Sequence, residues 1–215
     1  MIYKIYNEPT YSSIKQILLN RGINENQIEE WLNADWTQIN SPWLFGEEKV
    51  NHAIQLMSEN KDFYVVVDCD ADGFTSAAII MNYLYAVYPE RADNFHYILH
   101  TGKQHGLEDT INQIPDNCLV ILPDSSTNDV IQMRELLNRG CSIVCMDHHE
   151  ADNYLEDEDN LVIINNQISD YPNKKMSAAG VVWQICRAWD EIDKRETAKD
   201  LIDLAALGNL SDMMD

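Results

Sequence analysis

The sequence predicts an α/β fold with a mostly parallel central sheet flanked by helices, preceded by a small helical N-terminal region. Hydrophobic residues repeat at helical spacing up to about residue 60, and from residue 62 short apolar, β-branched runs alternate with longer helical segments. Apolar residues make up 45% of the 215 residues, which is enough to bury a core of ordinary size. Strands that alternate with helices are typical of a parallel sheet, because a helix usually makes each crossover connection.

The N-terminal region, residues 1–60, contains three expected helices. Ser12 and Ser13 precede an amphipathic run that ends at Gly22, Asn24 can cap a second run that continues to Leu32, and a third run covers 44–57. We expect this region to pack on the core of a second domain, 61–215.

The second domain is expected to hold five strands and five helices, which alternate up to the fourth strand; an acidic loop leads to the fifth strand, and two helices close the chain. Each strand is a short apolar run, and Pro89 ends the first of the helices. The strands are predicted at 63–67, 95–99, 118–122, 142–146 and 161–164, and the helices at 72–88, 109–113, 127–140, 177–190 and 197–210.

Composition excludes several classes of function. The formal net charge of −21 argues against broad nucleic-acid binding through a basic face, but clustered carboxylates can hold divalent metals and so still accept a phosphate substrate. No run of about 18 apolar residues exists, so we expect no membrane span. The N-terminus lacks signal-peptide features, and the five cysteines form no CxxC pair and mostly resemble small buried hydrophobic residues. We therefore expect a cytoplasmic protein.

Three carboxylates, Asp68, Asp70 and Asp72, follow the first predicted strand within the segment DCDADG. Ligands of open α/β sheets bind at the carboxyl ends of strands, and three neighbouring carboxylates repel one another unless a cation or shared protons compensate. The spacing resembles an EF-hand loop, but the twelfth position is Ile79 rather than Glu, so we reject that interpretation. A nucleophilic first Asp, as in aspartyl-phosphate hydrolases, remains an alternative.

Further candidate metal-binding residues follow two other strands and the last helix. They are Asp124, the consecutive Asp147, His148 and His149, and Asp212. Carboxylates and imidazoles together suit manganese or a similar divalent ion. We therefore expect these residues to converge on one site for metal-assisted phosphoester hydrolysis, with a metal-bound hydroxide as the nucleophile.

The segment DCDADG, Asp124, the segment DHHE and the pattern LGxxxD ending at Asp212 resemble, in this order, the motif series of the DHH phosphoesterase superfamily. Within it the chain is most similar to the RecJ-like single-stranded-DNA exonucleases. The resemblance extends to residues 17–23, 41–45, 105–107 and 177–182, and so covers nearly the whole chain.

The resemblance implies a role for each motif residue. Five residues would be ligands of one or two Mn²⁺ or Mg²⁺ ions: Asp68, Asp70, Asp124, His148 and Asp212. Asp124 would bridge two ions, His149 would face the scissile phosphate, and Asp147 would orient the histidine pair. For Asp72, a catalytic role and helix capping both remain open. The family pattern has a histidine where this chain has Val66, which leaves the number of ions open.

The resemblance also implies a 5′→3′ exonuclease acting on single-stranded DNA. RecJ-type enzymes continue past the last Asp into another domain, so we expect a missing C-terminal domain or a protein partner to complete the substrate cleft. Two alternatives remain. The first is a phosphodiesterase of short oligonucleotides or cyclic dinucleotides, which the strong acidity favours. The second is a non-catalytic RecJ-like scaffold in replication or repair.

Overall fold

The computed structural model describes residues 12–60, 62–102 and 104–214. The chain divides into two compact units, Met1–Asn40 and Ser41–Asp215, and each is described by itself. The boundary predicted near residue 60 follows the change in hydrophobic period, whereas the second unit begins at Ser41. The third expected helix is part of this second unit, where it packs against two strands and a later helix.

The first unit contains short helical segments. Ser12 caps the first helix, because its Oγ accepts a hydrogen bond from the backbone N–H of Lys15, and Asn24 forms a capping box with Gln27, as the sequence predicts. Its segments are α1 (Ser13–Asn20), η1 (Glu25–Gln27), α2 (Ile28–Leu32) and η2 (Trp36–Gln38).

The second unit is built on a five-stranded sheet in which every pair of neighbours is parallel. The strand order is β2-β1-β3-β4-β5, and the strands are β1 (Phe63–Val67), β2 (Phe95–Leu99), β3 (Leu119–Pro123), β4 (Ser142–Asp147) and β5 (Leu161–Asn165). β3, β4 and β5 are buried along their whole length, which explains their continuous apolar sequences. The predicted α/β fold with a parallel sheet is confirmed.

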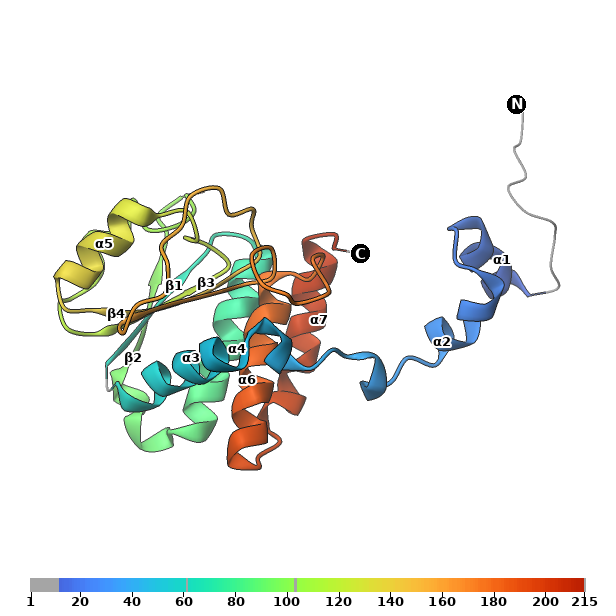
Figure 1. Cartoon of the computed structure of the whole chain (residues 1–215), viewed down its shortest axis with the longest axis horizontal. Helices are drawn as coiled ribbons and strands as arrows, with labels where there is room; N and C mark the ends of the chain where they lie inside the picture. The colour runs from blue at the N-terminus through green and yellow to red at the C-terminus, as the bar shows by residue number, and fades with distance from the viewer. Residues whose placement is uncertain (1–11, 61, 103, 215) are drawn as a thin grey trace. The chain divides into compact units, whose positions relative to one another are not determined.

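Helices cover both faces of this sheet (Figure 1). One face carries α5 (Val130–Asn138), and the other carries α3 (Glu47–Glu59), α4 (Ala71–Val87) and α6 (Ala178–Asp193). α7 (Ile202–Ser211) packs against α4 and α6. Short 3₁₀ segments complete the unit: η3 (Pro42–Phe45), η4 (Pro89–Asn94), η5 (Ile111–Gln113) and η6 (Thr197–Leu201).

Several predicted helices differ from the observed ones. The helix expected at 197–210 begins as the 3₁₀ segment η6 and is α-helical only from Ile202, and the run expected at 44–57 is α-helical only from Glu47. α5 begins at Val130 rather than at residue 127, because the backbone N–H and hydroxyl of Thr127 both donate to the carboxylate of Asp147. The helix expected at 109–113 is the single 3₁₀ turn η5. No helix among the described residues is long and apolar enough to cross a membrane.

The strand order places a switch point beside β1. The chain runs from β1 outward to the edge strand β2 and then returns to β3 on the other side of β1. Connections that leave two neighbouring strands in opposite directions open a crevice at the carboxyl ends of those strands. Asp68 follows β1 and Asp124 follows β3, so both residues lie at this crevice.

Candidate metal centre

The DCDADG segment places its three carboxylates in three different environments. Asp68 is fully buried directly after β1. Asp70 is the N-cap of α4, and its Oδ1 accepts a hydrogen bond of 2.9 Å from the backbone N–H of Gly73. Asp72 is buried in the first turn of α4. Asp70, and not Asp72, therefore caps this helix.

Asp72 connects two helices that are far apart in the sequence. Its Oδ2 accepts a hydrogen bond of 2.8 Å from the backbone N–H of Ala178, and its Oδ1 accepts one of 3.1 Å from that of Ala179. These N–H groups belong to the first turn of α6, where the helix dipole favours a negative charge. Burial nevertheless raises the pKa of Asp72.

Asp124 is the residue with the strongest indication of a cation site. It adopts a left-handed backbone conformation, with φ of 65°, and is 1% exposed. Neither carboxylate oxygen has a hydrogen-bond partner among the described residues. Burial and the charges of Asp72 and Asp70 raise its pKa to about 10.

The segment DHHE is organised by Asp147, the last residue of β4. Its Oδ1 accepts hydrogen bonds from the backbone N–H groups of His148 and His149 and lies 2.7 Å from His149 Nδ1, while its Oδ2 accepts two from Thr127. Burial alone would raise the pKa of Asp147, but the hydrogen bonds and charge of His149 lower it to about 2. Asp147 is thus an anion that holds the histidine pair through Oδ1 and Thr127 through Oδ2.

His148 lies at the centre of three carboxylates from different elements. Its Nε2 is 3.3 Å from Asp124 Oδ1, 3.6 Å from Asp212 Oδ2 and 3.8 Å from Asp72 Oδ2. Asp212 is the C-cap of α7 and is one-third exposed, whereas the other two carboxylates are buried. The structure therefore brings together residues more than 130 positions apart in the sequence.

These side chains form donor groups with the composition of divalent-metal sites. Asp68, Asp70 and Asp124 offer oxygen alone, whereas Asp72, His148 and Asp212 offer oxygen and nitrogen, and within each group the ligand atoms lie within 4.8 Å of one another. Asp124 also groups with His148 and His149. Buried carboxylate oxygens without a hydrogen-bond partner, at Asp124 and at Asp68, fit a site that a cation completes.

His149 faces a cavity of about 380 Å³ beside this centre. The cavity is lined by His105, Asp124, Ser126, Asn128, Asp147 and His149. The hydrogen bond to Asp147 raises the pKa of His149, and 55% of the side chain is exposed. His149 is therefore oriented on one side by Asp147 and accessible on the other.

Sequence reasoning gave no role to several residues that hold this arrangement. Asn165, at the end of β5, donates from Nδ2 to the carbonyl oxygen of His149, and Gln167 donates from Nε2 to that of His148. His105 lies 2.6 Å from Asp68 through its Nδ1. The motif spacing carries no signal for these contacts, because each joins segments that only the fold brings together. Val66, where the family pattern has a histidine, is fully buried in the apolar cluster beneath α5.

A family model described as "DHH family, N-terminal domain" matches residues 62–209. The chain belongs to the DHH family. The match covers every strand of the sheet and the DHH segment itself. Curated relatives named as single-strand DNA-specific exonucleases confirm the predicted RecJ-like resemblance.

Two curated relatives illustrate this similarity. YorK of Bacillus subtilis (strain 168), named as an SPbeta prophage-derived single-strand DNA-specific exonuclease, is 33% identical over 217 residues, which cover 97% of this chain and 35% of that protein. The single-stranded-DNA-specific exonuclease RecJ of the same organism is 26% identical over 172 residues, which cover 78% of this chain and 21% of that protein. The chain thus spans 35% or less of the length of these two relatives.

Solved structures of low identity share the fold. A structure of exonuclease RecJ bound to manganese matches with a TM-score of 0.66 at 22% identity, covering 77% of this chain and 43% of that one. RecJ from Thermus thermophilus in complex with Mn²⁺ matches with a TM-score of 0.65 at 20% identity, covering 93% of this chain and 28% of that one. Both likenesses support the same α/β architecture.

Proposed function

We propose that this chain carries the metal centre of a phosphodiesterase that removes nucleotides from an end of single-stranded DNA. The observation that carries the proposal is the convergence of Asp72, Asp124 and Asp212 on His148 Nε2, with Asp124 buried and lacking hydrogen-bond partners among the described residues. The names of YorK and RecJ supply the substrate class and the exonuclease activity. Digestion from 5′ to 3′ is proposed from the resemblance to the RecJ branch.

The ligands of the centre fall into two sets that share one residue. We assign Asp68, Asp70 and Asp124 to one divalent ion and Asp72, His148 and Asp212 to the other, with Mn²⁺ or Mg²⁺ as the natural choices for oxygen-rich sites. We add Asp124 to the second set because its Oδ1 lies 3.3 Å from His148 Nε2. Asp72 thereby becomes a ligand rather than a catalytic group. Divalent ions held there would lower the pKa of water and neutralise phosphate charge.

The side chains around this centre have separate tasks. His149 is held by Asp147 through Nδ1, so its Nε2 is available to position the scissile phosphate or to donate a proton to the leaving oxygen. Asp147 acts by orienting both histidines. Asp72 also holds the first turn of α6 next to α4, which fixes the wall of the site.

A second candidate substrate is a short oligonucleotide or a cyclic dinucleotide. The net charge of −21 favours it, because a long polyanion meets repulsion from the whole surface whereas a dinucleotide carries little charge. The cavity of about 380 Å³ beside His149 is also of the size that small ligands occupy.

Hydrolysis of three labelled substrates in Mn²⁺ tests the proposal: a 5′-labelled single-stranded DNA, a dinucleotide and a cyclic dinucleotide. We expect mononucleotides from the long strand, and loss of this product in His148→Ala. His52→Ala is the matched control, because His52 lies in a different cavity, near Ser142 at the amino end of β4. If only the small substrates are cleaved, the proposed exonuclease activity is wrong and the second candidate function replaces it. Equal hydrolysis by the wild type and His148→Ala would overturn the assigned centre.

A further inference from the structure

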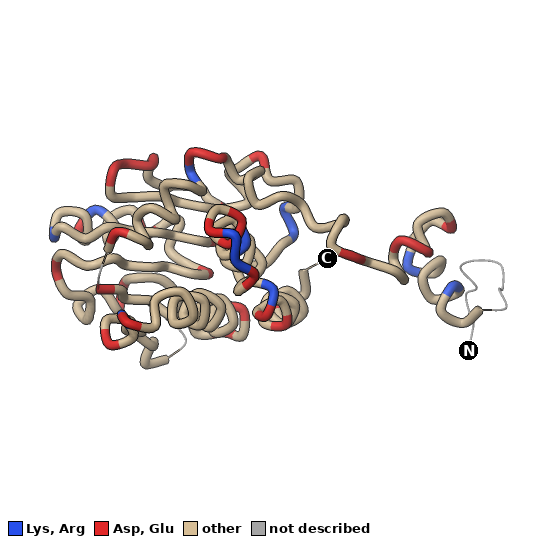
Figure 2. The backbone as a smooth tube through the Cα atoms, turned by 90° about the horizontal axis from the view of Figure 1, so that it is seen from below, with Lys and Arg blue, Asp and Glu red and all other residues tan. Residues whose placement is uncertain are grey.

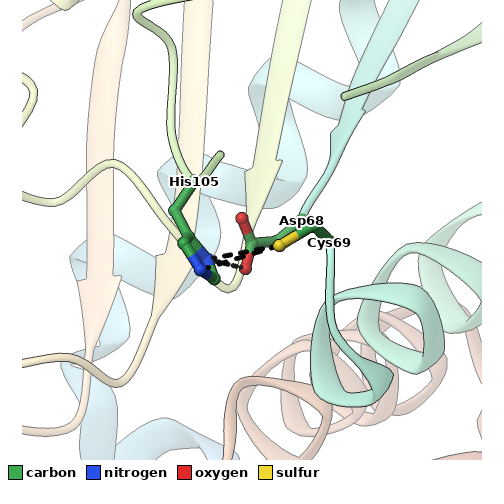
Figure 3. Close-up of side chains that lie close together, drawn as sticks. All are labelled: Asp68, Cys69 and His105. Carbon is green, nitrogen blue, oxygen red and sulfur yellow. Dashed lines mark hydrogen bonds and ion pairs between the residues drawn. The ribbon is translucent and has the colours of Figure 1, made fainter. Parts of the chain in front are cut away.

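A group of donors with different chemistry lies next to the proposed centre (Figure 3). It consists of Asp68, Cys69 and His105, whose ligand atoms lie within 4.8 Å of one another. We propose that these three side chains bind a borderline divalent cation such as Zn²⁺, at a site that shares Asp68 with the oxygen-rich centre. This site goes beyond the proposed hydrolysis and does not depend on it.

The distances within the group fit a tetrahedral ion. Cys69 Sγ lies 3.6 Å from His105 Nε2. Zinc binds sulfur at about 2.3 Å and nitrogen at about 2.0–2.1 Å, so two such ligands in tetrahedral geometry are about 3.6 Å apart. Asp68 Oδ2 and His105 Nδ1 are 2.6 Å apart and share a hydrogen bond, which can remain when His105 Nε2 binds the ion and Asp68 Oδ1 supplies the oxygen ligand. The ring and the thiol are thus already at ligand spacing.

The unsatisfied oxygen of Asp68 is an independent indication of a cation. Asp68 is fully buried, and its Oδ1 has no hydrogen-bond partner among the described residues. A buried polar atom without a partner disfavours folding, and a bound cation would remove this cost. His105 contacts only the other oxygen of Asp68, and the carboxylates of Asp70 and Asp124 lie beside it.

The backbone around the group is held by close packing. A Cβ on Gly73 would lie 2.5 Å from Asp68 Cβ, so the first turn of α4 lies directly against Asp68. Gly106 has φ of 76°, and a Cβ there would meet Asp129 Oδ2 at 2.3 Å. The same Oδ2 accepts a hydrogen bond of 2.8 Å from the backbone N–H of Leu107. The turn that carries His105 is therefore fixed next to the end of β1.

The donor set predicts which ion the site prefers. A thiolate and an imidazole select Zn²⁺ or Co²⁺ over Mn²⁺ and Mg²⁺, which prefer oxygen. The His105 side chain is 58% exposed and Cys69 is half-buried, so an ion is accessible from solvent and retains an open coordination position. His105 and His149 line the same cavity, so this open position faces the space proposed for the substrate.

Titration of the full chain with Co²⁺, followed by absorption spectroscopy, tests the proposal. We expect a thiolate-to-cobalt charge-transfer band in the wild type, its loss in Cys69→Ser, and at least tenfold weaker Co²⁺ binding in His105→Gln. The His148→Ala variant is the matched control, since it removes a ligand of the other centre and should keep the band. A failure of the hydrolysis assay is therefore distinguishable from a failure of this site.

Zn²⁺ content measured by equilibrium dialysis provides the second readout. The wild type should bind one more Zn²⁺ than either Cys69→Ser or His105→Gln, and circular dichroism should show that both variants are folded. No charge-transfer band in the wild type, a band that persists in Cys69→Ser, or equal Zn²⁺ content in all three proteins would overturn the proposal. If Cys69→Ser does not fold, the His105→Gln comparison decides in the same way.

Discussion

At Asp124, burial and neighbouring carboxylates act against the folding of the metal-free protein. The folded pKa of about 10 lies above the value of about 3.9 for an Asp in an unfolded chain. Between these values the folded state retains a proton that the unfolded state has lost, so the stability contributed by this group is present below pH of about 4 and is lost as the pH rises towards 10.

The Asp124→Asn variant should therefore be more stable than the wild type when metals are chelated. An amide carries no charge and can donate to the neighbouring carboxylates, so we expect a gain of about 1–3 kcal/mol, the usual cost of an unsatisfied buried polar group. The gain in stability should be larger at pH of about 8 than at pH of about 5, because the wild type loses the contribution of Asp124 to stability as the pH rises. Thermal unfolding in chelator at both pH values measures it. A variant less stable than the wild type at both values would contradict the assignment.

Asp147 has the opposite character, because each of its oxygens already has hydrogen-bond donors. In Asp147→Asn, an NH₂ group replaces one of the two carboxylate oxygens. This group cannot accept the hydrogen bonds that the oxygen accepted, which are those of Thr127 for one oxygen and those of the two histidines for the other. We expect kcat/KM to fall about 10- to 100-fold, as for other residues that orient metal ligands. Asp109→Asn is the control, since Asp109 accepts from His100 in a similar pair outside the centre. Equal effects of the two substitutions would show that Asp147 has only a structural role.

At the scale of elements, the approach of α7 to α4 determines where Asp212 lies. A Cβ on Gly208 would meet Ala179 Cβ at 2.4 Å, Asp72 Oδ1 at 2.4 Å and Thr75 Oγ1 at 2.8 Å. None of these three atoms lies at the end of a long side chain that could move aside. With a larger residue at position 208, α7 must therefore move away from α4 and α6. Since Asp212 ends α7, its carboxylate moves with the helix.

We expect Gly208→Ala to destabilise the protein by about 1–3 kcal/mol, the usual cost of overpacking, and to weaken Mn²⁺ binding. Gly102→Ala is the matched control, because its Cβ would meet mainly the end of the Gln104 side chain, which can move. Urea unfolding and Mn²⁺ titration of both variants provide the comparison. Unchanged stability and Mn²⁺ affinity in Gly208→Ala would show that the close approach of α7 is unimportant.

The elements also show what the sequence could and could not predict. The strands were predictable because short β-branched apolar runs are typical of strands buried in a parallel sheet. The residues that follow β1, β3 and β4 then lie at the same edge of that sheet. The start of α5 was not predictable, because Thr127 donates a hydrogen bond to Asp147, which lies at the end of a different strand, β4. The contact of Asp72 with α6 and that of His105 with Asp68 depend likewise on segments far along the chain.

At the scale of the whole molecule, charge governs access to the site. Acidic residues outnumber basic ones by 36 to 15, and Figure 2 shows them on many loops of the second unit. Divalent ions at the centre attract a phosphate locally, while the rest of the surface repels a long anionic strand over about a Debye length.

The two candidate substrates should therefore respond differently to salt. For a long single strand we expect KM to fall as NaCl rises from about 20 to about 150 mM, the reverse of the behaviour of a nuclease with a basic groove, while KM for a dinucleotide changes little. Steady-state kinetics at constant Mn²⁺ measures both. A KM for the long strand that rises with salt would instead indicate a basic binding surface.

The central claim is that Asp124 joins two sets of ligands into one centre for divalent metal. Isothermal titration of the metal-free wild type with Mn²⁺, in parallel with Asp124→Asn, tests it most directly. The ligand sets predict saturable binding of up to two ions in the wild type, and loss or at least tenfold weakening in the variant. Absence of saturable binding in the wild type, or equal binding in Asp124→Asn, would contradict the claim.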